Sequence, residues 1–343
     1  MLEFGVYDMK GNILMETINN KNKMSKYKVG MIAALSCNFL WGFLPIYWQS
    51  LIPIDSFVII FYRITTMAIV CFVIGVYKYG IKELYKPMFE NKRFMVKYIL
   101  SGLVITINWS LYIWAVNANY VIQTCMGYFL EPLIVCLFGV IIFKEKPNKW
   151  KKISILIACV GLAIVVVGYG ELPLIAISLG VTFSIYAAIK KSVELDPILS
   201  LLYETTFLVP VAIGFMMFYE FSGKGAFAVA EPYQIFLLLL SGALTATPLG
   251  LYSYAANKLP LITIGITEYI SPSITLIIGI FLFKEPFDII QFSAFVVIWI
   301  GLVFFTYGEV REVKGEVPAA DSTMSSEVKE TEKLAKEDDL EKR

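Results

Sequence analysis

Four ionisable side chains lie deep inside long apolar runs of the sequence: Arg63, Glu131, Glu204 and Glu268. A charged group at the centre of a membrane costs at least about 2.5–3.5 kcal/mol, so each of them needs a partner or a water-filled cavity. Loss of water favours the neutral form of a carboxyl group, which lets it exchange a proton. We expect Glu131 and Glu268 to share a central cavity; the alternative is that Arg63 and a glutamate clamp a zwitterionic or anionic substrate. For Arg63 and Glu204 a structural ion pair or a snorkelling side chain is the other interpretation.

Two prolines stand beside these carboxylates. Pro132 follows Glu131 directly, and Pro272 comes one turn after Glu268. A proline inside a helix removes a hydrogen bond and bends the chain. Paired breaks at equivalent places mark the binding sites of many transporters, so the pattern predicts such a site, with kinks that only help helices to pack as the alternative.

Amphipathic side chains that could orient a small ligand cluster near the same runs. The residues that we expect to bind substrate or couple transport are Arg63, Asn108, Trp109, Tyr112, Tyr128, Glu131, Glu204, Tyr252 and Glu268. Hydrogen bonds between helices are the alternative for the polar members of this set.

The residue types exclude several chemistries. The 343 residues include no histidine, which removes the commonest general base and metal ligand. The five cysteines lie in apolar runs without a CxxC motif, so we expect small buried hydrophobic side chains and neither a disulfide framework nor a metal set. No P-loop motif is present. The sequence therefore predicts no enzyme, no cofactor and no metal.

Composition indicates how these side chains are positioned. The chain is 58% hydrophobic and 17% charged with a mean hydropathy of +0.70, which predicts an all-α integral membrane protein. We expect ten transmembrane helices, at 28–50, 55–77, 96–116, 119–143, 152–169, 172–190, 197–219, 233–256, 261–283 and 288–308. Nearly all Lys and Arg fall in alternate connections, which predicts cytoplasmic N- and C-termini in the inner or plasma membrane.

The second half of the chain repeats the first. Residues 101–168 align with 241–308 without a gap at a shift of 140 positions. The matches include Gly102/Gly242, Tyr112/Tyr252, Pro132/Pro272 and the FKE segments at 143–145 and 283–285. The shift spans five helices, an odd number, so the two repeats at 28–169 and 172–308 are predicted to be inverted. Residues 1–27 form a polar segment that we expect to be non-native before Met24, and 309–343 a charged, disordered or loosely helical cytoplasmic tail.

Several segments together resemble a known family. They are FLWGFLPIYW at 39–48, NWSLYIWAVN at 108–117, GYFLEP at 127–132, YET at 203–205, GALTATPLGLYSYAANKLP at 242–260 and EYISPSITLIIGIFLFKEPF at 268–287. They are similar to the RarD branch of the EamA group, in the drug/metabolite transporter superfamily, over about 28–308. The resemblance implies a ten-helix inner-membrane permease for small metabolites or drugs.

The function that these observations favour is secondary transport by alternating access, with proton coupling as one option. The partners would be a small-molecule substrate, the lipid bilayer and protons, with no nucleic acid; the oligomeric state stays open. A channel or a membrane scaffold without active transport is the alternative.

Overall fold

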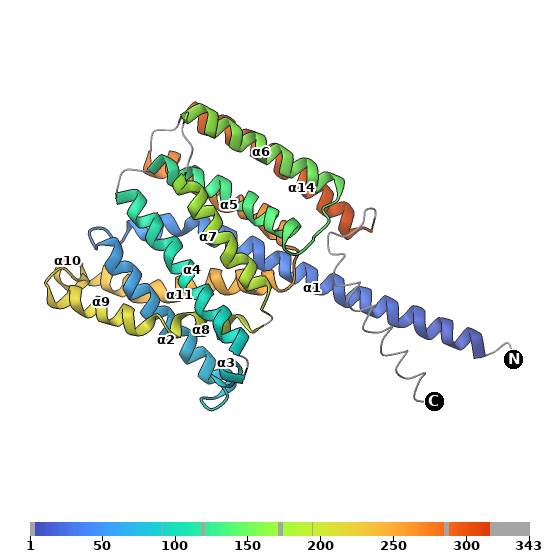
Figure 1. Cartoon of the computed structure of the whole chain (residues 1–343), viewed down its shortest axis with the longest axis horizontal. Helices are drawn as coiled ribbons and strands as arrows, with labels where there is room; N and C mark the ends of the chain where they lie inside the picture. Colours follow the sequence, from blue (N-terminus) through green and yellow to red (C-terminus); the bar gives the residue numbers. More distant parts are fainter. Residues whose placement is uncertain are drawn as a thin grey trace.

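The computed structural model describes residues 4–90, 92–117, 121–170, 174–193, 195–284 and 288–315. Side chains are described across these ranges except at some helix positions, which include 4–24, 121–126, 128 and 129. Every regular element in these ranges is a helix, and the helices form one bundle (Figure 1). They are α1 (Phe4–Gln49), α2 (Ser56–Tyr79), α3 (Lys86–Glu90), α4 (Lys92–Asn117), α5 (Val121–Ile141), α6 (Lys149–Tyr169), α7 (Leu174–Lys191), α8 (Pro197–Thr206), α9 (Val209–Phe221), α10 (Ala226–Val229), α11 (Pro232–Ala256), α12 (Leu261–Glu268), α13 (Ile270–Ile278), the π-helical turn η1 (Gly279–Phe283) and α14 (Ile289–Val313).

Most of the helices have the dimensions of membrane spans. Eight of those described are long and apolar enough to cross a bilayer, or nine if the bent pair 197–206 and 209–229 counts as one span. The other predicted span, 119–143, corresponds to α5, whose part with described side chains is a shorter apolar helix, Leu130–Ile141. The prediction of an all-α membrane protein is confirmed, whereas the described residues do not establish the number of ten spans.

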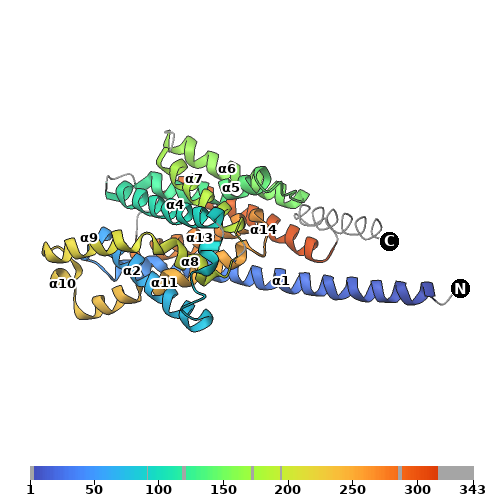
Figure 2. The same cartoon turned by 60° about the horizontal axis from the view of Figure 1, so that its bottom comes forward.

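The helices are arranged in layers. In Figure 2, α4 to α7 lie above α1, α2, α8, α9 and α11, in agreement with the helix contacts within each group. Helix α12 packs against α5 of the upper group and α1 of the lower group, and α6 lies along α14. The short α12 therefore connects the two layers.

Capping side chains fix where several helices begin. Those whose oxygens accept hydrogen bonds from backbone N–H groups of the first turn are Asp55, Asn148, Asp196 and Asp288. Asn148 and Asp288 lie 140 positions apart. At the same shift, Lys144 and Lys284 both adopt the left-handed conformation, with φ of 52° and 54°. The two lysines of the repeated segments therefore turn the chain in the same way at equivalent positions.

Two predicted spans are interrupted in the second half of the chain. The span at 197–219 is broken at Phe207 and Leu208, between α8 and α9, with a bend of 59°. The span at 261–283 is broken at Tyr269, because Pro272 has no N–H to donate to the carbonyl of Glu268. Pro132, by contrast, lies inside the continuous helix α5. The predicted pair of proline breaks is thus realised only in the second half.

The helix at each end of the chain is longer than predicted. Helix α1 begins at Phe4 and projects from the bundle in Figure 1, so the polar segment before residue 28 continues the first span. Helix α14 continues to Val313 and places Glu309 and Glu312 on a helix rather than in the tail. Residues 316–343 lie outside the described residues.

Equivalent glycines make equivalent contacts in the two halves. A Cβ at Gly102 of α4 would lie 2.4 Å from the carbonyl oxygen of Glu204 on α8. A Cβ at Gly242 of α11 would lie 2.2 Å from the backbone of Thr66 on α2. Only glycine permits so close an approach of two backbones. Since 102 and 242 are repeat positions, α4 packs on the second half as α11 packs on the first.

Helices α6 and α14 also pack on each other through equivalent glycines of the two halves. A Cβ at Gly161 of α6 would lie 3.2 Å from the carbonyl oxygen of Ala294 on α14, and one at Gly301 of α14 would lie 3.3 Å from that of Ser154 on α6. Gly161 and Gly301 are 140 positions apart, and so are Ser154 and Ala294. The contact is therefore symmetric between the repeats.

Candidate functional site

Arg63 on α2 lies between two indole rings. Its guanidinium carbon Cζ is 3.8 Å from the centroid of the Trp109 ring on α4 and 5.1 Å from that of Trp48 on α1. A guanidinium over an aromatic face is attracted by the ring, more strongly where water is excluded. The structure brings together the predicted residues Arg63 and Trp109, and it adds Trp48, which sequence reasoning did not select although it lies in the FLWGFLPIYW segment.

The other polar candidates of α4 and α5 differ in their surroundings. Asn108 is buried, and its side-chain nitrogen donates to the carbonyl of Leu179 and to Thr182, both at 2.9 Å, so it joins α4 to α7. This contact matches the alternative stated for the polar candidates, an interhelical hydrogen bond. The ring of Tyr112 is 37% exposed. The side chain of Tyr128 lies outside the described residues.

Tyr252 and Glu268 lie in the interior, and the half-buried Glu131 interacts electrostatically with both. Glu268, the last residue of α12, and Tyr252 on α11 are 3% and 1% exposed. The Glu268 carboxylate interacts electrostatically with Glu131 of α5 and with the Tyr252 hydroxyl. No hydrogen bond of standard geometry satisfies either Glu268 oxygen or the Tyr252 hydroxyl among the described residues. Buried carboxyl groups with so few hydrogen bonds are uncommon and often functional, so this cluster is the strongest candidate for proton exchange.

Glu204 forms a different arrangement. Its carboxylate pairs with Lys190 of α7, and Ser200 bridges the two by accepting from Lys190 at 2.8 Å and donating to Glu204 at 3.2 Å. Lys190 and Glu204 are both nearly fully buried. The pair ties α7 to α8, as in the structural alternative stated for the charged residues. Sequence reasoning assigned Lys190 to a connection and missed this contact.

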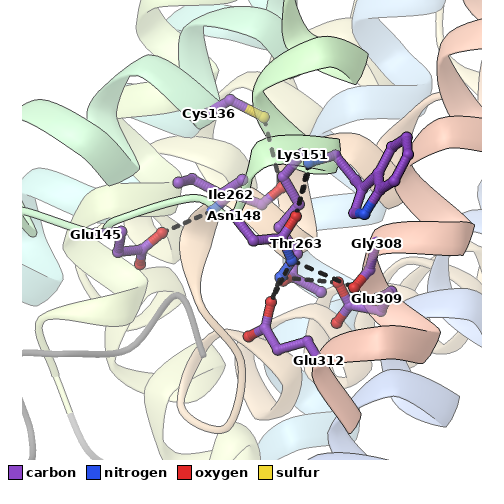
Figure 3. Close-up of polar contacts among 10 residues, drawn as sticks. Cys136, Glu145, Asn148, Lys151, Ile262, Thr263, Gly308, Glu309 and Glu312 are labelled. Carbon is purple, nitrogen blue, oxygen red and sulfur yellow. Dashed lines mark hydrogen bonds and ion pairs between the residues drawn. The ribbon is translucent and has the colours of Figure 1, made fainter. Parts of the chain in front are cut away.

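A second charged cluster lies where α6 begins and α14 ends, which we call the lysine-rich end (residues 144–152, 190–191, 258–263 and 308–312). Lys151 is fully buried there, and its Nζ lies 2.8 Å from a carboxylate oxygen of Glu309 and 2.8 Å from one of Glu312 (Figure 3). Asn148 donates to Glu312 at 2.9 Å and to the carbonyl of Gly308 at 3.2 Å. These bonds fasten α14 to the start of α6.

Glu145 fastens α12 at the same end. Its two carboxylate oxygens accept the backbone N–H groups of Leu261 at 2.6 Å and Ile262 at 2.9 Å. Lys191 lies 3.5 Å from this carboxylate and donates to the carbonyl of Leu259 at 2.7 Å. Glu145 is only 3% exposed. Sequence reasoning used the FKE segment only as a match between the repeats, and its occurrence in both of them is the signal that could have indicated a role for Glu145.

The cysteines fit their prediction in part. Cys37, Cys71 and Cys136 are buried and free, whereas Cys159 is exposed on the outer face of α6, which corrects the expectation that every cysteine is buried. Among the residues with described side chains, no group of three or more Cys, Asp or Glu is placed to hold a metal ion.

Comparison with known proteins identifies the family. The model of the EamA-like transporter family matches the chain twice, at residues 28–167 and 172–307. The chain belongs to the EamA-like transporter family. It is 36% identical over 289 residues to the uncharacterized transporter YojE of Bacillus subtilis, in an alignment that covers 83% of this chain and 95% of that protein.

Further relatives narrow the assignment. Protein RarD of Streptomyces exfoliatus is 28% identical over 293 residues, covering 84% of this chain and 92% of that protein. Protein RarD of Escherichia coli is 25% identical over 280 residues, covering 80% and 93%. A solved crystal structure at 14% identity has a TM-score of 0.63 and covers 81% of this chain and 97% of that one, a likeness of fold alone. The predicted RarD branch of the EamA family is confirmed, and the protein is a membrane transporter of the drug/metabolite type.

Proposed function

We propose that this EamA-family chain is a secondary transporter that moves a small molecule by alternating access between two inverted five-helix halves, 28–169 and 172–308. The observation that supports this best is that each half contacts the other through residues at equivalent repeat positions. Gly102 and Gly242 each bring a helix of one half onto the other, and Gly161 and Gly301 do so between α6 and α14. Inverted repeats around a site near mid-membrane are typical of secondary transporters.

The distribution of basic residues supports an orientation with both termini in the cytoplasm of the cell membrane. The lysine-rich end then faces the cytoplasm. The contacts of Lys151 with Glu309 and Glu312, and of Glu145 with α12, hold that end together. The described conformation is therefore assigned to the state that is closed toward the cytoplasm.

Substrate binding is assigned to the aromatic and charged groups around Arg63. Its guanidinium between Trp48 and Trp109 offers a fixed positive charge with apolar walls, which suits a small molecule that carries a carboxylate or another anionic group. Tyr112 and Tyr128 are also assigned to substrate binding. Glu204, bound to Lys190, is assigned to holding α7 and α8 together rather than to the substrate.

Proton coupling is assigned to Glu131 and Glu268, with Tyr252 beside them. Two carboxyl groups that interact in a buried place do not ionise together easily, so the pair is suited to holding one proton and releasing it when water gains access. The pair lies on α5 and α12, which are equivalent parts of the two halves. Movement of the halves would therefore change its surroundings.

Reconstitution in proteoliposomes tests the proposal. The substrate would be chosen by comparing the metabolites of cells with and without the gene. We expect saturable transport that a pH gradient drives, loss of this dependence in the double variant Glu131→Gln, Glu268→Gln, and unchanged transport in the control Glu83→Gln, whose side chain is 62% exposed. A double variant that keeps full dependence on the gradient would refute the coupling.

The alternatives have different outcomes in the same assay. A channel gives flux that does not saturate and cannot accumulate the solute against its gradient. A scaffold gives no flux at all, and substitution of Arg63 then changes nothing. Either result would overturn the proposal of a secondary transporter.

A further inference from the structure

Helix α12 is the short first part of the span Leu261–Phe283. It starts at Leu261 after Pro260 and ends at Glu268, where the break at Tyr269 separates it from α13. All eight of its residues are buried. A helix with a break at one end and a loop at the other can move as a unit, because few backbone hydrogen bonds resist its displacement.

Two contacts hold α12 against residues 131–145, and the like charge of Glu131 acts on its C-terminal residue. At its N-terminus, Leu261 and Ile262 donate to Glu145. In its middle, a Cβ at Gly265 would lie 2.8 Å from the carbonyl oxygen of Pro132, so the two helices touch backbone to backbone. At its C-terminus, Glu268 faces the charge of Glu131.

The cap at Glu145 carries most of the hydrogen bonding at the start of α12. The first N–H groups of a helix have no acceptor within the helix, so those of Leu261 and Ile262 depend on this carboxylate. Hydrogen bonds to an ionised acceptor at a helix N-terminus are stronger than neutral ones. A shift of α12 away from α5 breaks both of them at once.

Other charged and titratable groups face the two ends of α12. Those near Glu145 are Lys191 on α7, Lys151 on α6 and Cys136 on α5. Those near Glu268 are Glu131 and Cys136 on α5, Tyr252 on α11, Cys37 on α1 and Tyr269. Among the residues with described side chains, positive charge is thus found near the Glu145 end, and the groups named near the Glu268 end are acidic or neutral.

We propose that Glu145 is a positioning residue that transmits the charge state of Glu131 and Glu268 to the lysine-rich end through α12. This inference rests on the proposed proton coupling. When one proton is shared by the two carboxyl groups, α12 stays against α5 and its cap on Glu145 is intact. When the proton leaves, two negative charges in one buried place repel each other, α12 moves off α5, and the cap opens.

Hydrogen exchange of the intact protein measures directly whether the hydrogen bonds of α12 to Glu145 are formed. The amides of Leu261 and Ile262 are the probes, with rates corrected for the intrinsic effect of pH on exchange. We expect their protection at pH 6 to fall about tenfold or more by pH 9, the scale of one lost charge-assisted hydrogen bond. Glu268→Gln, which stays neutral, should keep these amides protected at pH 9, and Glu145→Gln should leave them exposed at both pH values.

Asp196→Asn is the matched control, because Asp196 also caps a helix at this end through the amide of Ile198. It should leave the α12 amides unchanged. Protection of Leu261 and Ile262 that ignores both pH and Glu268→Gln would overturn the inference, even if Glu145→Gln failed to fold, because those two measurements do not need that variant.

Transport assays separate this inference from the proposed function. If the closed end favours the protonated pair, Glu145→Gln should lower the pH at which transport is half-maximal, by about one unit for a tenfold loss of the closed state. If transport by the wild type does not depend on protons, the proposed proton coupling is refuted, but the hydrogen-exchange result for Leu261 and Ile262 still stands. A proton-dependent wild type whose pH profile is unmoved by Glu145→Gln would refute the role of Glu145 alone.

Discussion

Replacing Lys151 by methionine removes the ammonium group that lies against Glu309 and Glu312. The side chain of Lys151 is 0% exposed and those of the two glutamates 10% and 7%, so water cannot replace the lost charge. Breaking a buried ion pair by removing one partner typically costs about 3–5 kcal/mol, because the remaining charge stays buried and uncompensated. We therefore expect Lys151→Met to lower the free energy of unfolding by about that amount.

The neighbouring residue is the control. Lys152 is exposed on the same turn of α6, so Lys152→Met should change stability by no more than about 0.5 kcal/mol. Unfolding would be followed by tryptophan fluorescence in mixed micelles titrated with sodium dodecyl sulfate. The triple variant Lys151→Met, Glu309→Gln, Glu312→Gln should recover part of the loss, since it removes the buried negative charge as well.

If Lys151→Met were no less stable than Lys152→Met at pH 8, the assignment of a buried ionic cluster at the lysine-rich end would be wrong.

Three further predictions follow from individual contacts. Gly242→Ala should destabilise the protein by about 1–3 kcal/mol or more, because its Cβ meets the backbone of α2, whereas Gly214→Ala, with open space around it, should be neutral or slightly stabilising in the same unfolding assay. Partial burial alone would raise the pKa of the Asp196 carboxyl, but hydrogen bonds from Lys78 and a backbone N–H outweigh it and hold that pKa below its ordinary value. The stability that this lowered pKa adds is complete above the ordinary aspartate pKa of about 4 and is lost as pH falls through the lower folded value. At pH 6, Asp196→Asn should therefore be less stable than the wild type, by under about 1 kcal/mol because the Lys78–Asp196 pair is so exposed. At the lowest pH the two proteins should be equally stable. Arg63→Lys should weaken substrate affinity at least several-fold without changing the unfolding midpoint, since an ammonium group does not stack as a planar guanidinium does; equal affinity in a binding assay would contradict the assigned role.

The membrane class and the repeat were accessible from the sequence because both depend on local pattern. Long apolar runs can satisfy their backbone groups in a bilayer only as helices, whatever their neighbours are. The shift of 140 positions placed Gly102 with Gly242 and Lys144 with Lys284, and the structure gives each pair the same kind of contact or backbone conformation. Neither inference required knowing which helix touches which.

The partners of the charged residues could not be predicted in this way. The ionic contacts of Glu204 with Lys190 and of Lys151 with Glu309 join helices that are adjacent only after the bundle has formed. Sequence reasoning gave Glu204 a place near the substrate and left Lys151 in a connection. Whether a buried charge binds a ligand or another side chain depends on distances that are set by packing.

The sequence by itself determined that this protein is a helical membrane protein with an internal repeat, because hydropathy, glycine positions and proline positions act over a few residues at a time. Only the tertiary structure decided that Glu145 caps α12, that Trp48 joins Trp109 around Arg63, and that Glu268 faces Glu131. The physical reason is that a charge or a hydrogen-bond donor acts over a few ångströms in space, whichever residues of the chain folding brings within that range.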